Sequence, residues 1–348
     1  MGIKKPEVKQ PRFLIARIDR IGDVILSTPL PREIKRVYPE SFVAVLIREY
    51  TKDIYLNNPF VDEIIIYDEN DKSFEGFIKQ VQLIRSYKFN YAFMLLPDER
   101  LNYILFLAGI PFRVGVGHKV FQMLTFTKFV DRKKYIPLRH EADYALDMIR
   151  KIGIEPISLE PEIHLSEPEK QKATEFRNQL VGNDKKLIGV NTTSGNSAPN
   201  LTVEEYRKLL IQLSKDDNLK VIVTDKNPPE EILNISGVQF PFIDNSLRDA
   251  IIKFSALDLL ISNSTGPMHI CAALKVPTLS LFCPLTACSP KLWGPLGNKS
   301  KIVLPKEEYC KTKCPGDPKL CKYEGDSGIN TESVYEMTKK FLKMIQAK

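Results

Sequence analysis

The chain has 348 residues, of which 43% are hydrophobic and 27% are charged, and its formal net charge is +7. This composition excludes the hydrophobic-poor, highly charged class of disordered chains. The length exceeds what one hydrophobic core usually supports, so we expect two domains. The basic residues are spread over both halves and form no basic tail, which argues against a nucleic-acid-binding protein.

The sequence gives no sign of a segment that crosses a membrane. No apolar run reaches the roughly 20 residues that span a bilayer, and the best candidate, residues 104–112, is interrupted by Gly109 and Pro111. The N-terminal residues carry basic charge without an apolar signal core behind them. We therefore expect a cytoplasmic protein that touches at most the inner face of the cytoplasmic membrane.

The first half alternates short β-branched or aromatic runs with amphipathic segments, which is typical of βαβ units and parallel sheets. We predict strands at residues 13–18, 42–47, 63–67, 91–96 and 113–116. The predicted helices are residues 24–37, 75–86, 101–107 and 141–152. A connection with three prolines follows at residues 155–168, so we place the domain boundary between residues 165 and 166.

The alternation restarts in the second half, after a polar helix at residues 169–180. Predicted strands are residues 187–191, 221–224, 259–262 and 278–282, and predicted helices are residues 203–215, 229–235, 247–254 and 267–274. A last helix at 332–345 has an apolar stripe that must pack on something, and the first domain is one candidate. The expected fold is therefore α/β, with two Rossmann-like doubly wound domains, 1–165 and 166–348, that face a central cleft.

In such sheets the ligand sites lie at the carboxyl ends of the strands, so the loops after strands matter most. Gly22 permits a tight turn after the first strand, and Asp23 falls at the start of the next helix. Aspartate is also a favoured helix cap, so capping alone is one explanation for Asp23. Arg17 and Arg20 beside the carboxylate favour a different one, a site for an anionic substrate.

A second loop, residues 262–269, opens a helix in the second half. Its small and hydroxyl residues precede a proline at the first helical position, where free N–H groups and the helix dipole favour a phosphate. The residues concerned are Ser264, Thr265, Gly266, Pro267, Met268 and His269. A packed histidine is the commoner role for a residue like His269, but here it is expected near the same sheet edge.

A third loop, residues 191–200, follows the first strand of the second half and includes Thr192, Thr193, Ser194 and Gly195. Its hydroxyls and backbone N–H groups suit a diphosphate, although an ordinary polar loop has the same composition. Two polar loops and a helix start at one sheet edge favour a nucleotide site more than any of them alone. Walker A, G-x-S-x-G and His-rich metal patterns do not occur.

Two further groups of residues leave alternatives open. The basic stretch between Arg113 and His140 includes Lys119 and is interleaved with aromatic residues, so it is either a solvated face or a surface that contacts an acceptor or a membrane. Cys310, Cys314 and Cys321, with Cys283 or Cys288, could hold a structural zinc. Their spacing lacks the paired C-x2-C pattern, which favours reduced or reversibly oxidised thiols over a metal.

Three segments together resemble the heptosyltransferase family of inverting GT-B glycosyltransferases, which acts in lipopolysaccharide core biosynthesis. They are FLIARIDRIGDVILSTPL at residues 13–30, NSTGPMHICAAL at residues 263–274 and WGPLG at residues 293–297. The resemblance spans nearly the whole chain in the right order. It implies an acceptor-binding first domain and a second domain that binds a nucleotide sugar, usually ADP-heptose, without a metal or other cofactor.

The resemblance also implies roles for particular residues. Asp23 is the general base, and Arg17, Arg20, Gly22, Arg113 and Lys119 lie on the acceptor side. Donor contacts come from the Thr192 to Gly195 loop and from the motif that runs from Ser264 to His269. A carboxylate after the next strand holds the ribose; Glu230 is the best match, with Asp225 and Glu231 close by.

Two positions depart from the family pattern. Many relatives have an aspartate where this chain has Ser264, and a Lys or Arg followed by Trp where it has Pro199, Asn200 and Leu201. A missing cation weakens stabilisation of the leaving diphosphate. The alternatives are therefore a weak or silent GT-B protein that only binds a nucleotide or glycan, and a transferase that uses another nucleotide sugar.

Overall fold

The computed structural model describes residues 8–132, 135–181, 185–195 and 198–346. Lys133 and Lys134 of the basic stretch, and Asn196 and Ser197 of the polar loop, lie outside the described residues. The chain divides into two compact units, Met1–His164 and Leu165–Lys348.

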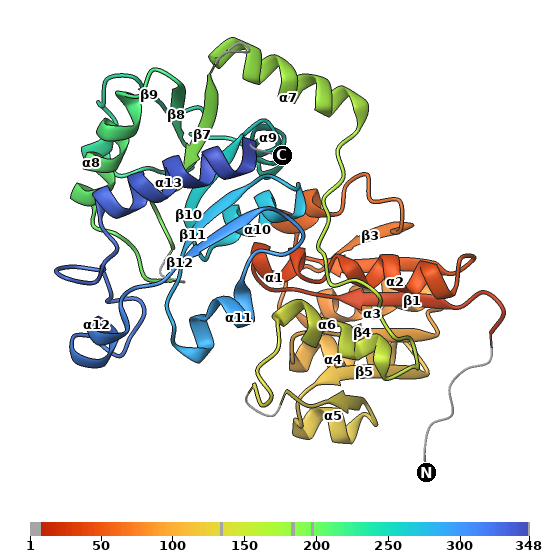
Figure 1. The fold of residues 1–348 in the computed structure, drawn as a ribbon. Helices are drawn as coiled ribbons and strands as arrows, with labels where there is room; N and C mark the ends of the chain where they lie inside the picture. The colour runs from red at the N-terminus through yellow and green to blue at the C-terminus, as the bar shows by residue number, and fades with distance from the viewer. Residues whose placement is uncertain (1–7, 133–134, 182–184, 196–197, 347–348) are drawn as a thin grey trace. The chain divides into compact units, whose positions relative to one another are not determined.

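The first unit is built on a sheet of six parallel strands with helices on both of its faces (Figure 1). The strands are β1 (Arg12–Ala16), β2 (Phe42–Ile47), β3 (Glu63–Ile66), β4 (Tyr91–Met94), β5 (Phe112–Val116) and β6 (Lys128–Val130). Their order is β3-β2-β1-β4-β5-β6, which is the dinucleotide-fold order with its switch point between β1 and β4. Leu14 of β1 pairs with Ala44 and Ala92 on its two sides, and all three are fully buried.

The helices of the first unit connect these strands. They are α1 (Ile21–Ile25), α2 (Pro29–Val37), the 3-10 helix η1 (Glu49–Ile54), α3 (Phe74–Ser86), α4 (Glu99–Leu107), α5 (Val120–Leu124) and α6 (Glu141–Arg150). The single helix predicted at residues 24–37 is wrong, because the chain breaks between α1 and α2. The Ser27 and Thr28 hydroxyls donate to the carbonyls of Val24 and Ile25, and Pro29, which has no N–H, restarts the helix.

The second unit repeats the plan with another sheet of six parallel strands. Its strands are β7 (Lys186–Val190), β8 (Leu219–Val223), β9 (Val238–Gln239), β10 (Leu259–Asn263), β11 (Thr278–Leu281) and β12 (Ser300–Val303). The order β12-β11-β10-β7-β8-β9 is the same as in the first sheet, with the switch point between β7 and β10. This pair of sheets confirms the predicted fold class of two doubly wound α/β domains.

The second unit's helices are α7 (Glu167–Leu180), α8 (Val203–Ser214), η2 (Glu230–Ile232), α9 (Leu247–Ser255), α10 (Gly266–Ala273), η3 (Thr286–Cys288), α11 (Pro290–Trp293), α12 (Glu307–Thr312) and α13 (Thr331–Gln346). The helix predicted at residues 229–235 is only the 3-10 turn η2. Val334, Phe341 and Leu342 of α13 are buried in the second unit's core, and Thr331 bonds to Glu205 of α8. The apolar stripe of α13 thus packs on α8 within the second unit.

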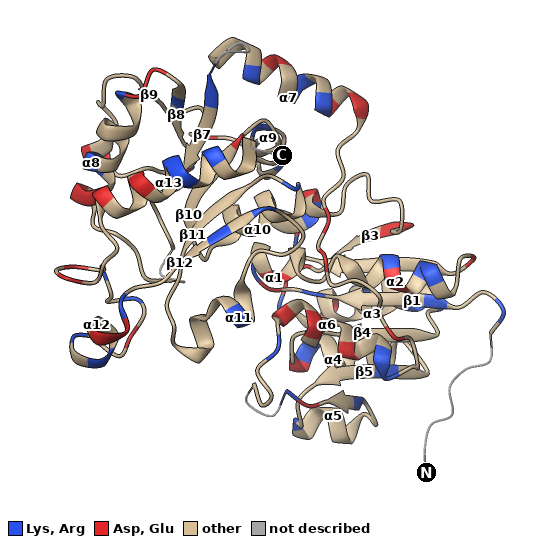
Figure 2. Ribbon diagram, in the orientation of Figure 1, with Lys and Arg blue, Asp and Glu red and all other residues tan. Residues whose placement is uncertain are grey.

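Acidic and basic residues are interspersed over the helices of both units (Figure 2). Arg139 and Arg150 of the first unit, for example, both pair with Asp143 and Asp147. Such mixed charge keeps a surface soluble without forming a strong field of one sign.

Candidate active site

A buried arginine at the carboxyl end of β1 organises the first candidate site. Arg17 follows the last residue of β1 and is only 3% exposed. Its Nη2 lies 2.6 Å from Oδ1 of Asp23, and its Nε lies 2.8 Å from Oδ1 of Asp19. The sequence prediction that Arg17 and Asp23 lie together is therefore realised as a direct ion pair.

Glu141, the first residue of α6, completes this cluster from a distant part of the chain. It is 1% exposed, and its Oε1 lies 3.4 Å from Arg17 Nη2. Arg132 Nη1 approaches the same carboxylate at 2.9 Å. Arg17 is thereby held between three carboxylates, which fixes the direction of its guanidinium because buried charges persist only when they are paired.

Burial and the neighbouring charges both shift the pKa values of Asp19 and Arg17. Burial raises the pKa of Asp19 to about 6, although Arg17 lowers it; the neighbouring Asp23 charge raises it further. Burial alone would lower the pKa of Arg17, but the charges of Asp19, Asp23 and Glu141 bring it above its ordinary value. Arg17 therefore stays positively charged beside Asp23 at any physiological pH.

Asp23 itself remains accessible. Its side chain is 19% exposed and lies in the first turn of α1, whereas the cap of that helix is Arg20. Helix capping therefore does not explain this aspartate. Arg17 occupies Oδ1, and Oδ2 has no hydrogen-bond partner among the residues that the structure describes. One oxygen is thus anchored while the other is able to accept a proton.

The other residues predicted on the acceptor side do not share one environment. Arg20 and Lys119 are exposed, and Gly22 is half-buried in α1. Arg113 is buried, and its guanidinium donates to the backbone carbonyls of Ile110 and Thr125. Arg113 therefore supports the chain from inside, and we remove it from the acceptor site, which corrects the prediction.

In the second unit, Asp225 holds the loop that follows β7. This carboxylate is 3% exposed and accepts hydrogen bonds from the backbone N–H groups and the hydroxyls of both Thr192 and Thr193, and from Asn191 Nδ2. Burial raises the pKa of Asp225 although the bonds from Thr192 and Thr193 lower it. The donors of Thr192 and Thr193 that we had assigned to a diphosphate are thus already engaged.

Asn200 joins this loop to the neighbouring strand β10. Its Nδ2 donates to the carbonyl of Thr192 at 2.8 Å, and its Oδ1 accepts from the Tyr206 hydroxyl at 2.8 Å and from Asn263 Nδ2. Thr265 Oγ1 lies 3.4 Å from Asn191 Oδ1 and so links the same two loops. Asn200 is therefore a neutral amide inside a hydrogen-bond network that joins the two loops.

The start of α10 presents the second loop predicted to bind a donor. Thr265 is its N-cap, with an extended backbone, and Pro267 lies in the first turn. Ser264, Gly266 and Pro267 are half-buried and thus within reach of a ligand. Met268 and His269 are buried, with exposures of 0% and 4%. Their side chains fix the helix from inside, whereas the first turn offers N–H groups.

The remaining predicted donor residues lie nearer to solvent. Ser194 is half-buried, and Gly195 is exposed with a φ of 53°, a left-handed backbone that glycine adopts without strain. Glu230 and Glu231 are both exposed at the turn η2. The structure thus brings the loops after β7 and β10 together through Asn191 and Asn200, and it leaves Glu230 outside that network.

A model of one protein family matches residues 82–322, which is more than half of the chain: glycosyltransferase family 9 (heptosyltransferase). The chain belongs to this family. It is 24% identical over 317 residues to lipopolysaccharide heptosyltransferase 2 of Escherichia coli, covering 84% of this chain and 87% of that protein. The family assignment makes this protein a glycosyltransferase, and it confirms the resemblance found in the sequence.

Solved structures share the fold of this family 9 chain. A glycosyl transferase family 9 protein from Veillonella parvula has a TM-score of 0.78 at 23% identity and covers 96% of this chain and 97% of its own. The structure of E. coli ADP-heptose lps heptosyltransferase II has a TM-score of 0.74 at 20% identity and covers 97% of this chain and 100% of its own. Both likenesses support the GT-B fold class.

The sequence of this glycosyltransferase did not identify every residue of these sites. Glu141 is remote from Asp23 in the chain, and nothing in its surroundings marks it as more than a helix start. Asp19 lies two residues after Arg17 within residues 13–30, and its charge beside Arg17 is a signal visible in the sequence. Tyr206 looks like an ordinary helix residue, because its contact with Asn263 depends on how β7 and β10 lie side by side.

The cysteines of the family 9 chain are all free thiols. Within the described residues, no group of three or more His, Cys, Asp or Glu side chains is placed to hold a metal ion. The Cys283 thiol hydrogen-bonds to Cys288 and lowers the pKa of Cys288 to about 7. Among the described residues, no helix is long and apolar enough to span a bilayer.

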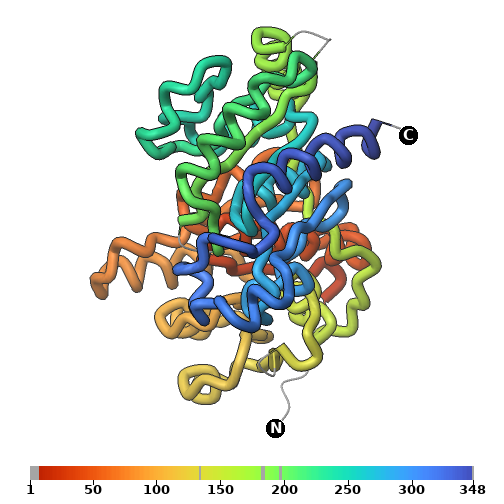
Figure 3. Tube along the Cα trace, turned by 60° about the vertical axis from the view of Figure 1, so that its left-hand side comes forward, coloured from red at the N-terminus to blue at the C-terminus, as the bar shows by residue number. Residues whose placement is uncertain are grey.

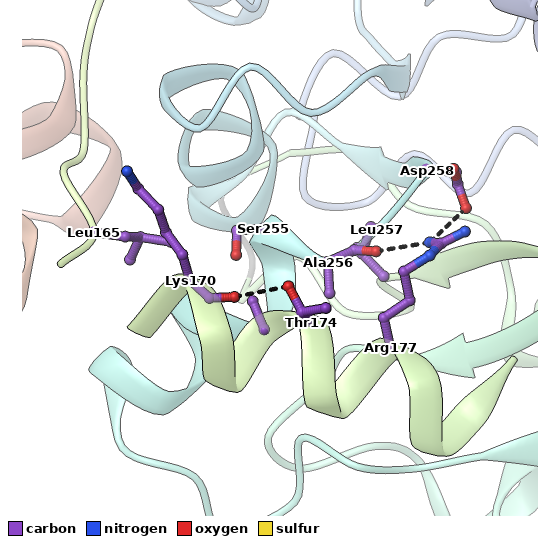
Figure 4. Close-up of a pocket in the computed structure, with 9 residues that line it drawn as sticks. Leu165, Lys170, Thr174, Arg177, Ser255, Ala256, Leu257 and Asp258 are labelled. Carbon is purple, nitrogen blue, oxygen red and sulfur yellow. Dashed lines mark hydrogen bonds and ion pairs between the residues drawn. The ribbon is translucent and has the colours of Figure 1, made fainter. Parts of the chain in front are cut away.

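Two surface pockets of the second unit lie away from these loops. One, of about 500 Å³, is lined by α7 and by residues 255–258 before β10, where Arg177 donates to Ala256 O and pairs with Asp258 (Figure 4). Another, of about 540 Å³, is lined by Lys186 at the start of β7 and by the end of α13. Both lie at the amino ends of the strands, opposite to the edge that carries Thr192 and Ser264.

Proposed function

We propose that this family 9 glycosyltransferase transfers heptose, with inversion, from ADP-heptose to a lipopolysaccharide core or related glycan. The family assignment supports heptose as the sugar, and the names of the E. coli relatives support the donor and the acceptor class. The single observation that carries the catalytic proposal is the partly exposed Asp23 carboxylate, anchored at one oxygen by the buried Arg17.

In this proposal the domain of residues 1–165 binds the acceptor, and the domain of residues 166–348 binds the donor. Exposed Arg20 and Lys119 attract an anionic acceptor, and Gly22 lets it approach the backbone. The donor contacts come from Ser194 and Gly195 on one loop and from Ser264 to Pro267 on the other. Glu230 contacts the ribose, while Thr192, Thr193, Met268 and His269 hold the two loops in place.

The transfer step needs one proton acceptor. Asp23 Oδ2 takes the proton from the acceptor hydroxyl as its oxygen bonds to the anomeric carbon. The bond from that carbon to the diphosphate oxygen breaks on the opposite face, and ADP leaves with the electron pair. Arg17 orients Asp23, and a positioned general base of this kind contributes roughly a hundred- to ten-thousand-fold to the rate.

The leaving diphosphate is stabilised by the second unit. Free N–H groups in the first turn of α10, with the helix dipole behind them, face the developing negative charge. The loop after β7 adds the backbone at Ser194 and Gly195. This arrangement requires no metal ion. A glycolipid acceptor also places the protein at the cytoplasmic face of the inner membrane, as a peripheral protein.

The test compares Asp23→Asn with Asp19→Asn, since both substitutions remove a negative charge that contacts the same arginine. Asp23→Asn keeps an oxygen for Arg17, so we expect normal folding and ADP binding with at least about a hundredfold loss of transfer. Asp19→Asn should lower transfer by less than about tenfold. Normal turnover by the Asp23 variant with purified ADP-heptose and acceptor would reject the proposal.

A further inference from the structure

The segment from α5 to β6 has the reverse of the usual burial pattern. Four of its apolar side chains are exposed, Val120 by 72%, Met123 by 72%, Leu124 by 64% and Phe126 by 70%, while Phe121 packs on the core. Its polar side chains are buried, with Gln122 and Thr125 exposed by 1% and Thr127 by 7%. Single exposed apolar residues are common, but four within seven positions form a patch that needs an explanation.

Hydrogen bonds lock this inverted arrangement. Asn102 of α4 donates to Thr125 Oγ1 at 2.9 Å and accepts from Thr127 Oγ1 at 3.1 Å. Gln122 Nε2 donates to the carbonyl of Val116 at 3.1 Å, and the buried Arg113 donates to the carbonyl of Thr125. The segment cannot turn its apolar side inward without leaving these buried polar groups unpaired, which is costly.

The backbone is also adapted to present Phe126. This residue has a φ of 54°, in the left-handed region that bulky side chains rarely adopt. Strain of this kind persists only where the surrounding structure enforces it, and it gathers at functional positions. Here it projects an aromatic side chain into solvent next to Met123 and Leu124 in the chain.

Basic residues flank the patch. Lys119 is exposed directly before Val120, and the ammonium groups of Lys128 and Lys151 lie 4.7 Å and 5.8 Å from the rings of Phe112 and Phe129. Phe129 is itself 42% exposed. The helix α5 carries no charge and is tan in Figure 2, and it lies at the edge of the first unit in both Figure 1 and Figure 3.

We propose that this segment, residues 119–129, docks the protein on an anionic lipid bilayer. Apolar side chains that project between lysines match an interface in which acyl chains lie beneath negatively charged headgroups. Charge complementarity decides for this partner, since an apolar protein groove would not need the lysines. The inference rests on the proposed function only in that a lipid-linked acceptor gives the protein a reason to reach a bilayer.

The experiment measures flotation of the full chain with phosphatidylcholine vesicles that contain or lack phosphatidylglycerol. We expect binding to the anionic vesicles that weakens with added salt. The triple variant Met123→Ser, Leu124→Ser, Phe126→Ser should bind at least about tenfold more weakly, because the apolar contacts are lost. The matched control is Phe74→Ser with Ile157→Ser, since these residues of the same unit are exposed by 78% and 76%. It should bind as the unchanged chain does.

A second pair of variants tests the charge. Lys119→Gln with Lys151→Gln should reduce binding to anionic vesicles severalfold and flatten its salt dependence. Equal binding by the triple variant and its control would overturn the proposal. So would self-association of the chain, seen in sedimentation and lost in the triple variant, without any vesicle binding, because the patch would then join copies of the chain.

Transfer to a water-soluble acceptor fragment separates this proposal from the proposed function. The triple variant should keep that transfer, since the proposed function gives none of its three positions a role in catalysis or in donor binding. A chain that binds anionic vesicles through the patch but transfers no heptose would refute the proposed function and leave the docking surface standing. Normal transfer without vesicle binding would refute the docking surface and leave the proposed function standing.

Discussion

Arg17 donates to Asp23 at 2.6 Å and meets Glu141 at 3.4 Å through the same nitrogen, Nη2. The direction of the Asp23 carboxylate is thus set by a residue that begins a helix far along the chain. Glu141 contacts no reacting group in the proposed mechanism, so it is a positioning residue. Its effect should appear in the rate of the chemical step rather than in donor binding.

We expect Glu141→Gln to lower kcat by about ten- to a hundredfold, because small errors in the placement of a base are costly. The KM for ADP-heptose should change less than about twofold, and a steady-state kinetic comparison would show the split. The control is Asp143→Asn on the same helix, which pairs with Arg139 and Arg150 instead. A lower stability of Glu141→Gln with unchanged kcat would show that Glu141 has only a structural role.

Asp19 should give the protein a measurable pH dependence of stability. Its pKa is about 6 when folded, against an ordinary value of 3.8, so the folded state binds this proton more tightly than the unfolded chain. Stability therefore falls as the pH rises between about 4 and about 6, and it stays level above that window. Asp19→Asn should remove this contribution and be more stable than the natural chain above pH ~6, by about 1–3 kcal/mol. Urea unfolding across the window measures it, and a contribution that rises with pH would contradict the assignment.

Asp225→Asn should loosen the loop after β7. An amide can present only one oxygen, so its NH2 group would face donors from Thr192 or Thr193 that now bond to the carboxylate. We expect about tenfold weaker ADP binding by calorimetry and faster proteolysis within residues 191–200. Glu230→Gln is the comparison, because a direct ribose contact would weaken ADP binding without affecting proteolysis. Unchanged proteolysis of the Asp225 variant would rule out its role as the loop's anchor.

Cys288 should be the thiol that reacts first with iodoacetamide. The hydrogen bond from Cys283 lowers its pKa to about 7, so half of it is thiolate near neutral pH. Mass spectrometry after brief labelling across a pH series should show a midpoint near pH 7 for Cys288, and Cys283→Ala should shift this midpoint upward. Cys271, whose pKa burial raises, should stay unlabelled in the folded protein. A labelling midpoint of Cys288 that is unchanged in Cys283→Ala would disprove the hydrogen-bond explanation.

The buried strands were predictable because each is a continuous apolar run, as in β2, where Val43 to Ile47 are fully buried. Strands β6, β9 and β12 were not, since they lie at sheet edges, are short and have exposed residues such as Phe129 and Ser300. Helix periodicity located α8 and α13 but could not reveal the break at Thr28, which depends on hydroxyl bonds to the preceding turn.

The candidate site shows the same division between local and tertiary information. Asp23 and Arg17 stand six residues apart in one motif, so their association was open to prediction from the sequence. The use of Asp225 as the anchor for Thr192 and Thr193 was not, because it depends on the register that places the end of β8 beside the end of β7. Arg113 was misassigned for a related reason: a basic residue in a basic stretch gives no sign that it points inward.

The shared strand order of the two sheets affects which parts of such a chain can change in evolution. In each half the reversal of strand order falls next to the first strand, between β1 and β4 and between β7 and β10, and the candidate residues stem from the short connections beside it. Each sheet is sealed by its own apolar strands, so these connections can be exchanged without disturbing either interior. If the halves divide donor and acceptor as proposed, new sugar or nucleotide preferences are accessible to selection through a few loop residues in one half, while the other half keeps its acceptor.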